Sequence, residues 1–323
     1  MLQLDRYLQS DLPWVRWAAM AWVQRRPHDD PQLRQAHLAV LAHPLVRAQL
    51  EVVLEQPWMP MKNHRQASHP IHRLALLVDL GLRVDDPPGR VIADRLLAQQ
   101  AADGPFQLLA QISKAFGGSG MPELQWAACD APLLLACLAS MGVPPASSLH
   151  SAAQHLVGLA QPVGWPCSTS PGFRGPGRKA DPCPYANLLA LRALSALSGF
   201  SDHPAADLGV QALLGHFERR AQRKIYLFGV GTDYAKPKYP LVWYDLLHVL
   251  EVLSRFATAR ADPRFLELLA LLEAQLGPGG TITPSTVWMA YKGFDFAQKR
   301  VPSPTLELAV ARILGRVQAA AVG

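Results

Sequence analysis

The sequence predicts an all-α fold, an α/α toroid in which about six outer helices surround six inner ones. Three observations support this prediction. A proline opens an apolar helical run six times, each of these runs is apolar on nearly all sides, and the runs between them are amphipathic. We therefore expect residues 1–323 to form a single domain of six helical-hairpin repeats.

The proline-led runs are the candidates for the inner helices. Proline suits the first turn of a helix because its missing N–H would have no partner there and its φ angle is already helical. A run that is apolar all round predicts burial on every side. The six runs begin near Pro13, Pro70, Pro132, Pro184, Pro240 and Pro304.

The segments between these runs are the candidates for the outer helices. DPPGRVIADRLLAQQ and DPRFLELLALLEAQ each have one apolar and one polar face, which is typical of a helix with one side in water. An open helical solenoid would use similar hairpins. Since six units are present, we expect a closed ring in which the first and sixth inner helices touch.

Composition and charge exclude several classes of protein. Half of the residues are apolar and 17% are charged, which indicates a globular chain. The net charge is +6, but no helix carries a basic stripe, so we do not expect nucleic-acid binding. Prolines and glycines interrupt the uncharged stretch 131–173, so no piece reaches the roughly 20 residues of a membrane span. The N-terminus lacks the apolar segment of a signal peptide, so we expect a cytoplasmic protein with reduced cysteines.

A weaker repeat occurs where the outer helices are expected to end. A glutamine is followed within a few residues by glycine or an aromatic, as in QPW at Gln56, QPVGW at Gln161 and QLGPGG at Gln275. These segments resemble the Q-x-x-x-G-x-W repeats of the terpenoid cyclase and protein prenyltransferase superfamily, and the resemblance covers nearly the whole chain. It implies an α/α toroid of the bacterial type with a central cavity for an isoprenoid.

In a closed ring, the N-termini of the inner helices would gather around one mouth of the cavity. Each N-terminus carries a partial positive charge and unpaired N–H groups, so this mouth favours an anion. Basic residues precede several inner helices and are expected to bind a diphosphate, or else to be solvated loop charges. The candidate residues are Arg174, Arg178, Lys179, Lys236 and Lys238.

One stretch also points to a metal. The segment GFRGPGRKADPCPYANLL resembles the prenyltransferase stretch whose Asp and Cys bind catalytic zinc, which implies Asp181 and Cys183 as ligands. The third ligand of that family lies in a later inner helix, where WYDLLHVLEVLS offers Asp245 or His248. The alternative is that Asp181 caps a helix, Cys183 is a buried thiol, and Asp245 and His248 form a polar pair.

Aromatic residues near the expected anionic mouth could line the cavity or fill it. Aromatic faces bind hydrocarbon chains and stabilise carbocations. The cyclases also use an aspartate to protonate their substrate, but the resembling segment WAACDAPLLL keeps only Asp130, so cyclisation by protonation is not expected. The candidate cavity residues are Trp14, Trp17, Tyr185, Trp243 and Tyr244.

Three functions remain open from the sequence. The first is an enzyme that transfers a prenyl group from an isoprenoid diphosphate, with zinc activating the acceptor. The second is a binding protein for a lipid or other amphiphile. The third is an interaction scaffold whose cavity is filled by its own side chains. Transfer to a protein is not expected, because the protein prenyltransferases need a second, helical-repeat subunit that this chain does not contain.

Overall fold

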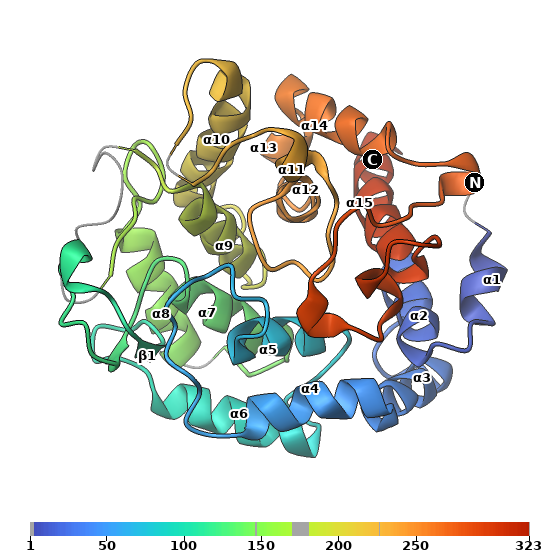
Figure 1. Ribbon diagram of the computed structural model, residues 1–323, viewed down its shortest axis with the longest axis horizontal. Coiled ribbons are helices and arrows are strands. Elements are labelled where there is room, and N and C mark those ends of the chain that lie inside the picture. Colours follow the sequence, from blue (N-terminus) through green and yellow to red (C-terminus); the bar gives the residue numbers. More distant parts are fainter. Residues whose placement is uncertain (1–2, 146, 170–180, 226, 323) are drawn as a thin grey trace.

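In the computed structural model, the helices form two concentric rings (Figure 1). The structure describes residues 3–145, 147–169, 181–225 and 227–322. The prediction of an all-α toroid is confirmed. Within the described residues, the inner ring consists of α2 (Pro13–Ala18), α5 (Pro70–Asp79), α7 (Ala131–Ser140), α9 (Pro184–Leu194), α12 (Leu246–Leu253) and α15 (Pro304–Val322).

The outer ring covers the inner one with amphipathic helices. Over the described part of the chain these are α3 (Pro31–Ala42), α4 (Pro44–Leu54), α6 (Pro87–Ala98), α8 (Ser147–Gly158), α10 (Pro204–Glu218) and α14 (Pro263–Glu273). Shorter elements connect the rings: helices α1 (Leu4–Leu8), α11 (Thr232–Ala235) and α13 (Ala257–Arg260), and the antiparallel strands β1 (Leu108–Ala110) and β2 (Glu123–Gln125). A π-helical turn, η1 (Ala19–Val23), continues α2. The 3-10 turns are η2 (Lys114–Phe116), η3 (Arg219–Ala221), η4 (Pro278–Gly280), η5 (Met289–Tyr291) and η6 (Asp295–Ala297).

Proline marks the start of the inner helices in all but one case. The prediction that Pro240 opens the fifth inner helix is wrong, because α12 begins only at Leu246. The Asp245 carboxylate accepts a hydrogen bond from the backbone N–H of His248 at 3.0 Å and so caps this later start. Before the cap, the chain runs into the centre of the ring, where the hydroxyl of buried Tyr239 donates to Asp79 at 2.6 Å.

The ring closes between its first and last members. Helix α15 packs against α2, which excludes an open solenoid. Asp295 ties the two helices together, because its carboxylate accepts from the indole N–H of Trp14 at 2.9 Å and from the backbone N–H of Thr305 at 2.9 Å. The hydroxyls of Ser303 and Thr305 donate to the same carboxylate at 2.6 and 2.7 Å.

Replacing Asp295 with alanine should therefore destabilise the protein by roughly 2–3 kcal/mol, the sum expected for a lost helix cap and orphaned donors. The midpoint of urea unfolding would fall, while Asp94→Ala, on the exposed face of α6, should leave it unchanged. Equal midpoints for the two variants would contradict the role of Asp295 in closing the ring.

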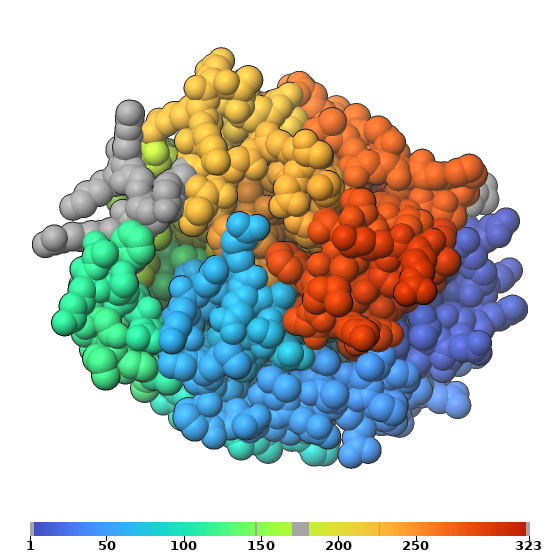
Figure 2. Space-filling view, in the orientation of Figure 1, coloured from blue at the N-terminus to red at the C-terminus, as the bar shows by residue number. Residues whose placement is uncertain are grey.

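The mouth at the N-terminal ends of the inner helices is filled by the chain itself. Segments 236–244 and 288–297 fold over it and bury a chain of aromatic rings. Phe296 lies 4.9 Å from Tyr239 and 5.0 Å from Phe294, and Phe294 lies 4.9 Å from Trp14, measured between ring centroids. Figure 2 shows the surface of these segments over the centre of the ring.

One helix pair has the length and composition that a membrane span requires. Across the described ranges, no single helix is long and apolar enough to cross a bilayer. Helices α3 and α4 meet the requirements of length and composition only when joined, and they are bent by 68°.

Candidate functional site

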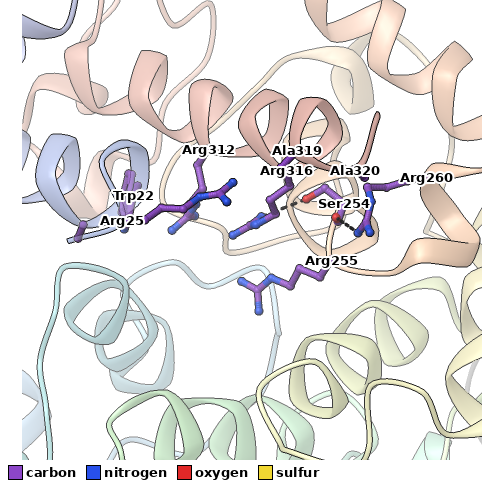
Figure 3. Close-up of a pocket in the computed structure, with 10 residues that line it drawn as sticks. Trp22, Arg25, Ser254, Arg255, Arg260, Arg312, Arg316, Ala319 and Ala320 are labelled. Carbon is purple, nitrogen blue, oxygen red and sulfur yellow. Dashed lines mark hydrogen bonds between the residues drawn. The ribbon is translucent and has the colours of Figure 1, made fainter. Parts of the chain in front are cut away.

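A pocket of about 640 Å³ lies at the opposite end of the ring, where the inner helices have their C-terminal ends. Its walls come from η1, from the end of α12 with the residues that follow it, and from the second half of α15 (Figure 3). The lining contains no carboxylate and five arginines: Arg25, Arg255, Arg260, Arg312 and Arg316. We call this site the arginine pocket.

A buried carboxylate holds three of these arginines in place. Glu251, on α12, is only 1% exposed, and its carboxylate lies 3.1 Å from Arg312 Nε, 3.0 Å from Arg316 Nη1 and 2.9 Å from Arg255 Nη2. A second buried carboxylate, Asp79 at the end of α5, lies 3.0 Å from Arg312 Nη1. The network therefore links three inner helices beneath the pocket.

The positive charge of the pocket exceeds the charge that balances it. Five lining arginines face two carboxylates, which leaves an excess of three positive charges. Burial and repulsion by neighbouring arginines lower the pKa of Arg316 to about 10, although Glu251 opposes this. Burial alone would raise the pKa of Glu251, but the arginines hold it far below its ordinary value. A bound anion would relieve this repulsion.

Several donors of the arginines that line the pocket have no protein partner. Arg312 Nη2, Arg255 Nε and Arg260 Nε are buried and have no hydrogen-bond partner among the described residues. Buried donors without partners are costly, so each needs an explanation such as a bound water or ion. Arg312 is itself only 9% exposed, and its guanidinium lies 4.1 Å above the ring of Trp22. Trp22 and the nearby alanines give the pocket an apolar wall beside its charged floor.

The basic residues predicted from the sequence do not belong to this pocket. Lys238 is buried at the other mouth, where its ammonium group lies 3.2 Å from the Asp233 carboxylate and 5.5 Å from the Trp288 ring. Lys236 is half-buried at the end of α11. Arg174, Arg178 and Lys179 lie outside the described residues. A second anion site at the N-terminal mouth therefore stays a prediction.

The side chains of three of the four residues predicted to bind zinc have other partners. Asp181 forms an ion pair with Arg223, Asp245 caps α12, and Cys183 precedes α9. His248 Nδ1 bonds the carbonyl of Trp243 at 2.9 Å, and burial lowers the pKa of His248 to about 3. Within the ranges that the structure covers, no three histidine, cysteine or acidic side chains are grouped so that they could hold a metal ion. The zinc site stays a prediction.

The aromatic residues predicted to line a cavity pack against protein side chains. Trp14, Trp17, Tyr185 and Tyr244 are buried and Trp243 is half-buried, and none lines the arginine pocket. The rings of Tyr185 and Trp243 lie 4.7 Å apart.

Asp130 is buried and lies against a partly exposed histidine. Its carboxylate makes no capping bond to α7 and instead lies 2.9 Å from His64 Nε2, although the two atoms are not aligned as a hydrogen bond. Burial would lower the pKa of His64, but the charge of Asp130 raises it above its ordinary value. Asp130 therefore takes part in an acid–base pair within the wall of the ring.

Comparison with known proteins yields structural likeness only. No protein-family profile and no curated protein matches the chain. The type II terpene cyclase MstE from Scytonema has a similar structure, with a TM-score of 0.45, 14% sequence identity, and coverage of 96% of this chain and 88% of that one. A protein from Actinoplanes has a TM-score of 0.42 and 15% identity, with coverage of 96% and 90%. Membership of the terpenoid cyclase superfamily stays a prediction from the motifs.

The sequence contained an overlooked signal of the arginine pocket. Charged residues interrupt two inner-helix runs that are otherwise apolar: Glu251 in LLHVLEVL, and Arg312 and Arg316 in AVARILGRV. A charge in a helix that is buried on all sides needs a partner of opposite charge or a ligand. These charges mark the two helices in the sequence but do not show that the helices meet.

Proposed function

We propose that this protein binds an isoprenoid diphosphate, or an organic diphosphate of similar size, in the arginine pocket. The observation that carries the proposal is the excess of positive charge around a pocket lined by five arginines, three of which also have a buried donor without a partner among the described residues. Guanidinium groups bind phosphate oxygens through paired N–H donors, and the delocalised charge suits a diphosphate better than a single carboxylate.

The dimensions and the apolar wall fit an amphiphilic ligand. The volume of about 640 Å³ lies within the ordinary range for small-molecule sites. Trp22 and Ala21, on η1, and Ala319, on α15, offer apolar surface beside the guanidinium groups. A diphosphate head would lie on the arginines while a short hydrocarbon chain contacts this wall.

The proposed site differs in place from the one expected from the motifs. The sequence predicted an anion site at the N-terminal mouth, where helix dipoles favour an anion. The arginine pocket lies at the opposite end, where the C-terminal dipole of α12 favours cations and so helps to hold Arg255 and Arg316 together. The fold of a terpene-cyclase-like ring is compatible with either location.

Isothermal titration calorimetry with geranyl diphosphate tests the proposal. Arg260→Gln and Arg25→Gln remove charges that do not contact Glu251, so they should weaken binding about 10- to 100-fold each without unfolding the network. Arg47→Gln, on the exposed face of α4, is the matched control and should bind like the unchanged protein. Titration with inorganic diphosphate and with geraniol separates the contributions of head group and chain.

Two outcomes would contradict the proposal. One is the absence of heat with either diphosphate at millimolar concentration and low salt. The other is equal affinity of the Arg260→Gln, Arg25→Gln and Arg47→Gln proteins, which would place the ligand elsewhere. Metal analysis of the purified protein separately tests the predicted zinc and, with it, the prenyl-transfer hypothesis.

A further inference from the structure

Two serines at the C-terminal ends of inner helices hold arginines of the pocket. Ser254 is the C-cap residue of α12 and is fully buried, and Ser195 is the C-cap residue of α9 and is half-buried. The hydroxyl of Ser254 donates to the carbonyl of Glu251 at 3.1 Å, and the hydroxyl of Ser195 donates to the carbonyl of Arg192 at 3.0 Å. Because each hydroxyl proton is used in this way, the lone pairs of each oxygen are left to accept hydrogen bonds.

Each serine oxygen accepts a hydrogen bond from one arginine that lines the pocket. Arg316 Nη1 donates to Ser254 Oγ at 3.0 Å, a bond drawn in Figure 3, and Arg255 Nη1 donates to Ser195 Oγ at 3.1 Å. Both arginines also contact the same Oε1 atom of Glu251, at 3.0 and 2.9 Å, so their guanidinium groups lie side by side. The two serines therefore hold two neighbouring arginines through the same local arrangement.

Both arginines keep donors that a ligand can use. Every hydrogen bond from Arg316 to the described residues is made by Nη1, which leaves its Nε and Nη2 donors. Arg255 donates once from Nη1 and once from Nη2, and its Nε has no partner in the described part of the chain. The two side chains are 24% and 25% exposed and both line the pocket, so a bound molecule can reach them.

We propose that Ser254 and Ser195 position Arg316 and Arg255 so that each arginine binds one phosphoryl group of a diphosphate. This inference rests on the proposed function. A hydroxyl orients a guanidinium group without cancelling its charge, whereas a further carboxylate would leave less positive charge for the ligand. Two guanidinium groups held side by side suit two linked phosphoryl groups, so the pocket should prefer a diphosphate to a single phosphate.

A double-variant comparison separates positioning from a general structural role. Inorganic diphosphate and inorganic phosphate are titrated by calorimetry into the unchanged protein, Ser254→Ala, Arg316→Gln and the doubly substituted chain. Ser254→Ala should weaken diphosphate binding about 5- to 10-fold, and phosphate binding less than about 3-fold because a single phosphate needs fewer arginines. In the Arg316→Gln protein the same serine substitution should change diphosphate affinity little, since Ser254 acts through that arginine.

The second serine supplies an independent test and a third serine supplies the control. Ser195→Ala is compared with and without Arg255→Gln in the same way, and it decides the matter if Ser254→Ala does not fold. Ser140→Ala is the matched control, because Ser140 is the exposed last residue of α7 and does not line the pocket. It should bind like the unchanged protein. Circular dichroism checks that each variant is folded.

The outcomes distinguish this inference from the proposed function. No binding of diphosphate by the unchanged protein would overturn the proposed function and, with it, the role of the serines. Diphosphate binding that is equally strong in the unchanged, Ser254→Ala and Ser195→Ala proteins would overturn the inference alone. So would a loss that is the same with and without Arg316, or the same for phosphate and diphosphate, because the serine would then act only on the structure.

Discussion

Replacing Glu251 with glutamine should lower the free energy of unfolding by roughly 3–5 kcal/mol, the cost of removing one partner from a buried charge network. The substitution keeps the shape of the side chain but leaves Arg312, Arg316 and Arg255 without the carboxylate that they share. Urea unfolding followed by circular dichroism measures the loss. Glu267→Gln, on the exposed face of α14, should change stability by less than about 0.5 kcal/mol.

Lowering the pH should weaken the same charge network and reduce the stability of the protein. The pKa of Glu251 is depressed in the folded protein, so its stabilisation is complete above the unfolded pKa of about 4.3 and is lost as the pH falls below it. The unchanged protein should therefore lose stability between about pH 5 and pH 3, and the Glu251→Gln variant should lose less of it over that window. Parallel pH profiles for the two proteins, or a loss of under about 1 kcal/mol at pH 7, would show that the arginines are held by other contacts.

Replacing Asp245 with asparagine should stabilise the protein, by up to about 4 kcal/mol above pH 7. Asp245 is 1% exposed, and its Oδ2 atom has no hydrogen-bond partner among the described residues. Burial raises the pKa of Asp245 to about 7 from an ordinary value of 3.8. Asparagine is also a good helix cap, so the bond to the His248 N–H can be kept while the buried charge is removed.

The sign of this effect follows from proton binding. Between about pH 4 and pH 7 the folded protein keeps a proton on Asp245 that the unfolded chain has lost, so stability falls as the pH rises through this window. The gain from Asp245→Asn should therefore be small near pH 4 and full above pH 7. Thermal unfolding at several pH values measures it.

A second capping aspartate, Asp262, serves as a control that separates the effect of the buried charge from the effect of the helix cap. Asp262 caps α14 by accepting from the Arg264 N–H at 2.9 Å, but hydrogen bonding with Arg264 lowers its pKa. Asp262→Asn should therefore not stabilise the protein above pH 7. If Asp245 binds zinc, as the family resemblance implies, Asp245→Asn would instead release metal and lower the melting temperature. That result would favour the metal site over the buried-charge interpretation.

Local sequence patterns determined the elements and their arrangement in two rings. Proline at the first helical position, all-round apolarity and amphipathic partners depend on residues close together in the chain, so the inner helices could be placed from Pro13 to Pro304. The pattern failed at Pro240 because long-range contacts decide that start. The hydrogen bond from Tyr239 to Asp79 and the cap at Asp245 together shift the start of α12 to Leu246.

Only the tertiary structure decided which polar residues meet. Asp79, Glu251 and Arg312 lie on three different inner helices, and nothing in their spacing along the chain shows that their charges converge beneath one pocket. The sequence alone predicted the two rings, because helix starts and the apolar pattern of each helix are local properties. The arginine pocket depends on the register and rotation of packed helices, because electrostatic contacts form only between side chains that the closed ring brings together.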